Sequence, residues 1–124
     1  MKLYHITKYK FLNSILQKGL LININFTSFV KQNHIEHYYD KYSMQPIFLT
    51  TDYEYIIKTQ LTKSFIKNNK LCLLKIFKDI RDLEGEYDYL NITTEKDYQN
   101  HKKSFISKKN IEPKDIKFIK LLIG

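Results

Sequence analysis

Apolar and polar side chains alternate at the start of the chain and then change to a helical spacing. Residues 3–7 alternate around His5, which predicts a short strand. A helix is expected next, because four apolar residues recur on one helical face: Phe11, Leu12, Ile15 and Leu16. Thr7 is expected to cap this helix, since its hydroxyl can accept an unpaired N–H of the first turn, and Gly19 is expected to end it.

The middle of the chain is predicted to hold a loop, a strand and a second helix. Residues 21–45 show no dominant period and indicate a long loop, with room for one short helix. Residues 46–50 predict a short apolar strand. Thr51 and Glu54 form a capping box for a helix that is expected to end at residues 68–69. Its apolar positions recur every fourth residue: Tyr53, Ile57, Leu61 and Phe65.

The second half of the chain is expected to be mostly strand. Residues 71–77 are nearly all apolar, as in a central strand covered on both faces. An acidic stretch follows at 79–88. Further strands are predicted at residues 87–92, 104–107 and 116–123. A helix or loop is expected at 94–103 and a turn at 112–115. The pattern predicts one α+β domain over residues 1–124.

The composition and the first residues of the chain indicate which class of protein to expect. Apolar residues make up 43% and charged residues 27% of the chain, as in a folded domain. No run of about 18 apolar residues occurs, so no membrane span or membrane partner is expected. The first ten residues lack the apolar core of a signal peptide. Cys72 is the one cysteine, which excludes an intrachain disulfide and fits a reducing, cytoplasmic location.

The net charge of +8 favours anionic partners. Of the 21 basic residues 20 are Lys, and Arg81 is the single Arg, although Arg is the residue best suited to specific phosphate recognition. Lys102 and Lys103 are the candidate contacts for a nucleic acid or an acidic protein surface.

Several kinds of chemistry find no support in the sequence. His34 and His37 have a metal-like spacing, but no further ligands complete a zinc set, so no metal is expected. Cys72 lies in the most apolar stretch, where a thiolate is disfavoured. The three glycines lie far apart, so they form no phosphate-binding loop. His5 and Thr7 are different, because they share one strand face and form a small polar platform.

Four short motifs along the chain resemble those of the small ADP-ribosyltransferase-fold proteins, which include DarT-type toxins and shorter phage and bacterial relatives. The motifs are Tyr4-His5-Ile6-Thr7, Ile15-Leu16-Gln17-Lys18-Gly19-Leu20, Ile47-Phe48-Leu49-Thr50 and Pro113-Lys114-Asp115-Ile116. The resemblance implies a split antiparallel β-sheet with flanking helices that cradles NAD, the substrate. It also implies that His5 and Thr7 hold the nicotinamide and its ribose.

The resemblance implies further site residues as well. Thr50 or Thr51 would line the cleft, and Tyr53 is the candidate stacking partner. Transferases of this fold also carry a late Glu that stabilises positive charge on the ribose. The corresponding place near Ser104 holds no acid, which leaves two candidates elsewhere: Glu86 and Glu112.

Three functions therefore stay open. The first is NAD-dependent ADP-ribosyl transfer to a nucleic acid or protein target, as in a toxin. The second is a catalytically inactive relative that acts by binding, such as a phage-type inhibitor of a defence or nucleic-acid-handling protein. The third is a basic nucleic-acid-binding module, in which lysines contact phosphates and the 18 Tyr and Phe rings stack on bases.

Overall fold

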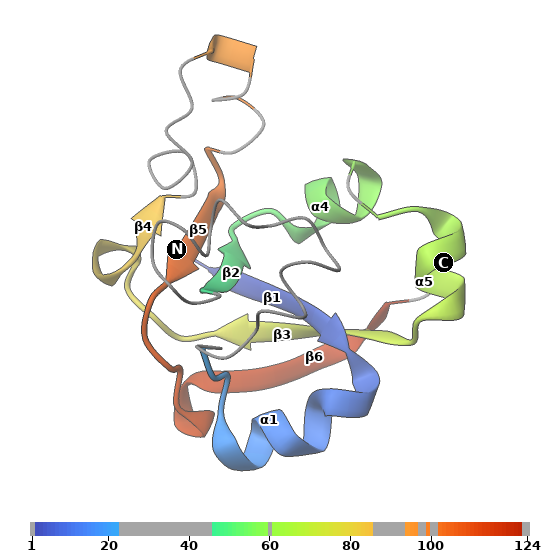
Figure 1. Cartoon of the computed structure of the whole chain (residues 1–124), viewed down its shortest axis with the longest axis vertical. Helices are drawn as coiled ribbons and strands as arrows, with labels where there is room; N and C mark the ends of the chain where they lie inside the picture. Colours follow the sequence, from blue (N-terminus) through green and yellow to red (C-terminus); the bar gives the residue numbers. More distant parts are fainter. Residues whose placement is uncertain are drawn as a thin grey trace.

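Six antiparallel strands form one open sheet in the computed structural model (Figure 1). The structure describes residues 2–22, 46–59, 61–85, 94–96, 99 and 102–122. The strands are β1 (Leu3–Lys8), β2 (Ile47–Thr50), β3 (Leu71–Ile76), β4 (Glu84–Gly85), β5 (Ser104–Ser107) and β6 (Ile116–Leu122). They are arranged in the order β4-β5-β2-β1-β3-β6, and each neighbouring pair is antiparallel. The chain is therefore α+β, as the sequence predicts.

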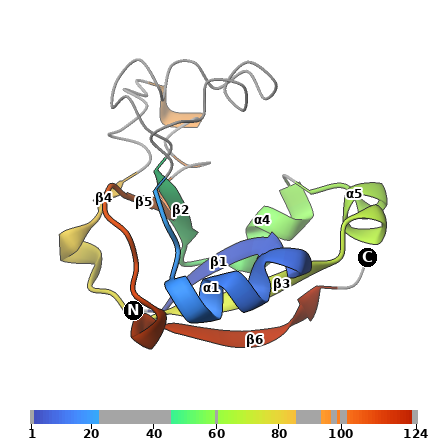
Figure 2. The same cartoon turned by 60° about the horizontal axis from the view of Figure 1, so that its bottom comes forward.

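Short helices cover both faces of this sheet. They are η1 (Tyr9–Phe11), α1 (Leu12–Lys18), α4 (Tyr53–Thr59), α5 (Lys63–Asn68), η2 (Ile80–Asp82) and η3 (Pro113–Asp115). Figure 2 shows α1 apart from α4 and α5, with β1 between them. None of the helices in the described part of the chain combines the length and apolar character that crossing a membrane requires.

The core consists of two clusters, one on each face. The larger cluster joins α1 to alternate residues of β1, β2 and β3, and its members include Leu3, Leu12, Ile15, Leu49, Cys72 and Leu74. The smaller cluster joins α4 and α5 to the other residues of β1 and β3, and includes Tyr4, Ile6, Tyr53, Ile57, Ile66 and Leu73. β3 contributes to both clusters, which confirms the prediction of a central strand covered on two faces.

The junction between β1 and α1 differs from the sequence prediction. Thr7 does not cap the helix, because β1 continues to Lys8 and η1 intervenes before α1. The N-cap position of α1 is Phe11, whose side chain makes no capping hydrogen bond. The prediction for Gly19 is confirmed, since its N–H donates to the carbonyl of Ile15 at 2.7 Å and closes the helix.

The predicted helix after β2 is two helices in the structure. Asp52, not Thr51, caps α4: its Oδ1 accepts the N–H of Tyr55 at 3.1 Å, so the capping-box prediction was wrong. The second helix has its own cap, because the Thr62 hydroxyl accepts the N–H of Phe65 at 3.0 Å. Thr62 starts a new helix, so the apolar spacing that continues to Phe65 does not correspond to one continuous helix.

The later strands agree with the prediction where the structure describes them. The predicted strand at 104–107 is β5, the predicted turn at 112–115 contains η3, and the last strand is β6, which ends at Leu122 in the described part. The predicted strand at 87–92 and most of the predicted loop at 21–45 lie outside the described residues.

Candidate functional site

The sheet opens between β1 and β2. β1 pairs with β3 along its whole length. With β2, in contrast, β1 has one paired position, Tyr4 opposite Thr50. One residue further along β1, the Nδ1 atom of His5 lies 2.7 Å from the carbonyl oxygen of Phe48. A side chain therefore occupies the place where main-chain pairing between these two strands stops.

The partner of His5 defines its protonation state. A carbonyl oxygen only accepts, so Nδ1 carries the proton and donates to Phe48. Burial lowers the pKa of the His5 imidazole, and the hydrogen bond to Phe48 opposes this shift to a smaller extent. At neutral pH the ring is thus neutral, and its Nε2 atom keeps a lone pair that can accept a hydrogen bond.

The His5 ring is largely buried, and its Nε2 atom is not completely enclosed. The ring makes one hydrogen bond to the described residues, and that bond uses Nδ1. Among those residues, no buried polar side-chain atom lacks a partner. Nε2 has no hydrogen-bond partner among these residues, and its lone pair could accept from a ligand hydroxyl or amide that reaches the ring.

The strand register separates the residues that the sequence analysis grouped together. His5 and Thr7 are paired with Leu74 and Cys72, which pack on the α1 side of the sheet. Thr50 is paired with Tyr4, which belongs to the cluster on the α4 and α5 side. Paired residues point to the same face, so Thr50 and the His5–Thr7 pair face opposite sides.

Tyr53 lies on the same side as Thr50. Its ring contacts that of Tyr4 edge to face, with centroids 4.9 Å apart and planes at 65°. Lys120 Nζ lies 5.4 Å from the centre of the Tyr53 ring. The described contacts of Tyr53 are thus those of a partly buried core residue, and none of them joins it to His5.

Thr50 and Thr51 converge on one carbonyl oxygen, that of Lys103. The Thr50 hydroxyl donates to it at 3.2 Å and accepts the N–H of Asp52 at 3.0 Å. Thr51 donates its N–H to the same oxygen at 2.9 Å, and its hydroxyl lies at 3.4 Å. These threonines fasten the start of α4 to the segment before β5.

Lys103 and Lys102 have different surroundings. Lys103 Nζ lies 3.0 Å from Oδ2 of Asp52, and this contact is the main reason that the pKa of Asp52 is lowered. Lys102 is exposed, and it lines a small hollow of about 80 Å³ whose other walls are Thr50, Tyr55, Gln99, Lys103 and Ser104. Of the two lysines, Lys103 is already engaged by a carboxylate.

The candidate acids do not meet His5 in the described structure. Glu86 lies outside the described residues. Glu112 is exposed, directly precedes η3 and lies 3.4 Å from Lys114 Nζ. It leads into β6, which is separated from β1 by β3. Ser104, near the place where the resemblance implies an acid, is buried and paired with Thr50.

The described residues contain no group of three or more metal-binding side chains. Burial also raises the pKa of the Cys72 thiol, as expected for an unreactive core cysteine. Two features of the structure are not evident from the sequence pattern: the Asp52 cap and a surface groove beside Phe11 and Phe65. Both rings are partly exposed, so the apolar helix pattern that included them overstated their burial.

Comparison with protein-family models, with curated proteins and with solved structures finds no match for this chain. The likeness to ADP-ribosyltransferase-fold proteins therefore rests on the four short motifs in the sequence.

Proposed function

We propose that this chain is an ADP-ribosyltransferase-like domain that binds NAD at the opening between β1 and β2 and transfers its ADP-ribosyl group to a nucleic acid or protein. The observation that carries the proposal is the His5 side chain. Its Nδ1–H is held by the Phe48 carbonyl, and its Nε2 has no hydrogen-bond partner among the described residues.

The chemistry of the ring supports a role in binding a ribose. A hydroxyl of the nicotinamide ribose can donate to the lone pair of Nε2, because the ring is neutral and its other nitrogen carries the proton. The Phe48 carbonyl fixes the orientation of the ring before any ligand arrives, which lowers the entropy that binding must offset. Thr7, two residues further on the same face, supplies a second hydroxyl beside it.

The transfer step needs a carboxylate, because positive charge develops on the ribose as nicotinamide leaves. Glu86 and Glu112 remain the candidates for this role. Glu112 would have to exchange its surface contact with Lys114 for a position at the opening. Thr50, Thr51 and Tyr53 support the proposal less, since their described contacts hold α4 in place.

The test separates the two functions of His5. Asn in place of His5 can keep an amide donor near the position of Nδ1, but it has no atom at the position of Nε2. We expect His5→Asn to remain folded and to lose NAD binding by about tenfold or more, as measured by calorimetry, since one hydrogen bond to a buried polar ligand group is worth about 1 to 2 kcal/mol. Unchanged NAD affinity in the folded variant would contradict the proposal.

Nicotinamide release from NAD tests the transfer step directly. Turnover that stops in His5→Asn and falls at least tenfold in Glu86→Gln or Glu112→Gln would identify the acid. Turnover that is unaffected by both acid variants would exclude both candidates.

A second function, binding without catalysis, is favoured by the buried Ser104 at the expected place of the acid. In that case the protein acts as an inhibitor of a defence or nucleic-acid-handling protein, or as a nucleic-acid-binding module. Absent nicotinamide release, together with oligonucleotide binding that weakens steeply with salt, would support this second function over the first.

A further inference from the structure

Carboxylates are distributed very unevenly along this chain. The 13 Asp and Glu residues leave two long stretches empty, residues 1–35 and 55–78, whereas these same stretches contain many lysines. The structure brings the two stretches together, because the N–H of Tyr9 in η1 donates to the carbonyl of Lys70 at 2.7 Å. In the described parts of both stretches, lysines are therefore present and carboxylates are absent where Tyr9 meets Lys70.

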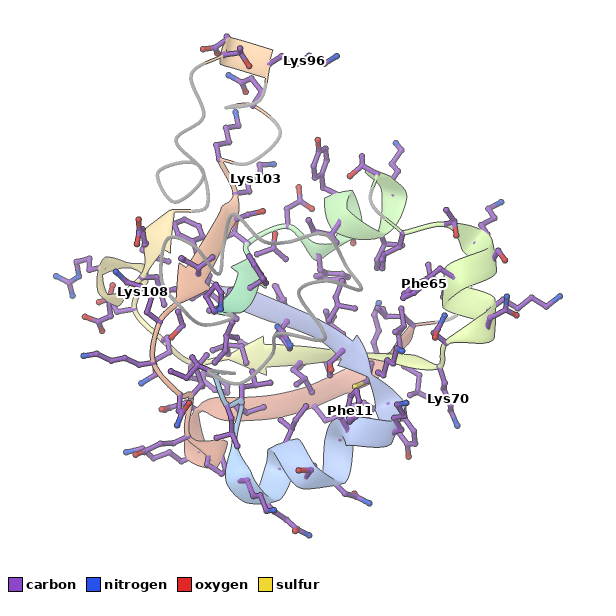
Figure 3. The ribbon with its side chains drawn as sticks, in the orientation of Figure 1. Phe11, Phe65, Lys70, Lys96, Lys103 and Lys108 are labelled. Atoms are coloured by element: carbon purple, nitrogen blue, oxygen red, sulfur yellow. The ribbon has the colours of Figure 1, made fainter. Side chains whose placement is uncertain are left out.

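A groove of about 450 Å³ lies between these two segments. Its lining is mostly apolar: Ile6, Thr7, Lys8, Phe11, Ile56, Leu61, Phe65 and Leu71. Phe11 and Phe65 are 48% and 40% exposed, which is high for phenylalanines that belong to helices. Figure 3 shows both rings on the same side of the molecule as Lys70, and Lys96 on the opposite side.

Lysines form the border of the groove. A neighbouring hollow of about 280 Å³ shares Lys8 with it and is lined further by Tyr9, Lys10, Asn68, Asn69 and Lys70. Lys70 Nζ lies 4.6 Å from the centre of the Tyr9 ring, and Lys10 Nζ lies 5.1 Å from that of Phe11. None of the described residues that line either cavity is Asp or Glu. Lys10 and Lys70 thus lie next to exposed aromatic rings, and the described lining residues offer them no carboxylate.

We infer that this groove binds an acidic, amphipathic segment of a protein partner. Apolar side chains of the segment occupy the space between Phe11 and Phe65, and its carboxylates pair with Lys8, Lys10 and Lys70. The groove lies on the α4 and α5 side of the sheet, since Ile6 and Leu71 belong to that cluster. Thr7 is the one lining residue that the register places on the His5 face, and His5 itself does not line the groove. Recognition of the acidic segment does not require NAD.

The lining favours a protein segment over a nucleic acid. Four aliphatic side chains form much of its surface: Ile6, Ile56, Leu61 and Leu71. Such a surface buries leucine or isoleucine side chains of a partner favourably. The polar edges of a nucleobase would lose water there without gaining hydrogen bonds. Lysine ammonium groups at the border match carboxylates at the edge of an amphipathic helix.

The test uses fluorescent peptides of about 14 residues, a length that presents apolar anchors over several helical turns. The first peptide has Leu at helical spacing and Glu and Ala elsewhere. The second replaces Glu by Lys, and the third replaces Leu by Ser. We expect fluorescence anisotropy to detect binding of the first peptide, weakened by salt, and at least tenfold weaker binding of the other two. Equal binding of the Lys peptide, or no binding of the first peptide, would overturn the inference.

Matched variants locate the site. Phe11→Ala and Phe65→Ala should each weaken binding of the first peptide by about tenfold, as for aromatic anchors at other interfaces. Phe77→Ala is the control, because Phe77 is also 48% exposed and also has a lysine, Lys75, at 5.1 Å from its ring, but does not line the groove. Loss of binding in Phe77→Ala equal to that in Phe11→Ala would overturn the inference.

A charge pair completes the experiment and does not depend on apolar packing. Lys70→Glu should weaken binding of the acidic peptide several-fold, whereas Lys96→Glu, on the opposite side, should change it by less than about twofold. Oligo-dT of similar length is measured with the same variants. Tighter binding of oligo-dT than of the acidic peptide, lost in Phe11→Ala and Phe65→Ala, would assign the groove to a nucleic acid and overturn the inference.

Discussion

The His5 imidazole donates its Nδ1–H to the carbonyl oxygen of Phe48 at 2.7 Å, so a side chain joins β1 to β2 beyond the Tyr4–Thr50 pair. In a continuous antiparallel ladder this carbonyl would be available to a main-chain N–H of the neighbouring strand. Here the strands leave the regular ladder, and the ring takes that place. His5 therefore contributes to the sheet and presents an acceptor at its opening.

The first prediction concerns the pH dependence of stability. In the unfolded chain His5 binds a proton at its ordinary pKa, about 6.5, whereas burial lowers its pKa in the folded protein. Below pH 6.5 the unfolded state binds more protons, so the contribution of this residue to stability is complete above that pH and is lost as the pH falls toward the lowered value. The slope for one proton approaches about 1.4 kcal/mol per pH unit.

His5→Asn is the control for that measurement, because an amide does not titrate in this range. Urea unfolding of both proteins at several pH values between 5 and 8 gives the difference in the free energy of unfolding. We expect this difference to change with pH below 6.5 and to be constant above it. A difference that is constant throughout would mean that the His5 pKa is not lowered by folding.

The second prediction concerns Gly19, the residue after α1. Its φ of 87° and ψ of −177° define a conformation that is essentially restricted to glycine. A methyl group there would also overlap the carbonyl oxygen of Ile111, which accepts the N–H of Leu20 at 2.9 Å. Gly19→Ala should therefore lower the free energy of unfolding by more than about 2 kcal/mol. Ser14→Ala, at an exposed position inside α1, should change it by less than about 0.5 kcal/mol.

The third prediction concerns the start of α4. Asp52→Ala removes the acceptor for the Tyr55 N–H and should lower the free energy of unfolding by about 1 kcal/mol. Thr51→Ala removes only a 3.4 Å hydroxyl contact and should cost less than about 0.5 kcal/mol. Chemical denaturation measures both. A larger loss in Thr51→Ala than in Asp52→Ala would restore the capping box that the sequence suggested.

The strands were predictable from the sequence because each of them has to bury an apolar face. β3 consists almost entirely of apolar residues, and the structure buries it on both faces. The helix boundaries were less predictable, because Thr51, Asp52 and Thr62 are all suitable cap residues. Which of them caps a helix depends on tertiary contacts, here the position of the Lys103 carbonyl.

The candidate site was predictable only in part, for a related reason. The position of His5 on a strand follows from local alternation, and the structure confirms it. Its partner Phe48 lies 43 residues away, and no local pattern encodes that contact. The faces of Thr50 and Tyr53 likewise depend on the register between β1 and β2, which the sequence does not specify. The acid-free stretches beside the groove, in contrast, can be recognised from the sequence alone.

The fourth prediction separates Lys102 from Lys103 as contacts for polyanions. From the sequence, both lysines are candidate partner contacts because they are neighbours in a basic segment. In the structure Lys103 Nζ lies 3.0 Å from Asp52 Oδ2, so part of its charge is neutralised. Lys102 is exposed beside it. Lys102 should therefore contribute more to the binding of an anionic partner than Lys103 does.

Oligo-dT binding at a series of salt concentrations tests this difference. Lys102→Ala should reduce the slope of log affinity against log salt by about 0.7, the value for one lost phosphate contact on a single strand. Lys103→Ala should change that slope less and should instead lower the free energy of unfolding by up to about 1 kcal/mol, because it breaks a partly exposed ion pair. Lys114→Ala is the matched control, since this lysine is also exposed and paired with a carboxylate, Glu112. Equal slopes for all three variants would mean that the basic segment before β5 does not contact the polyanion.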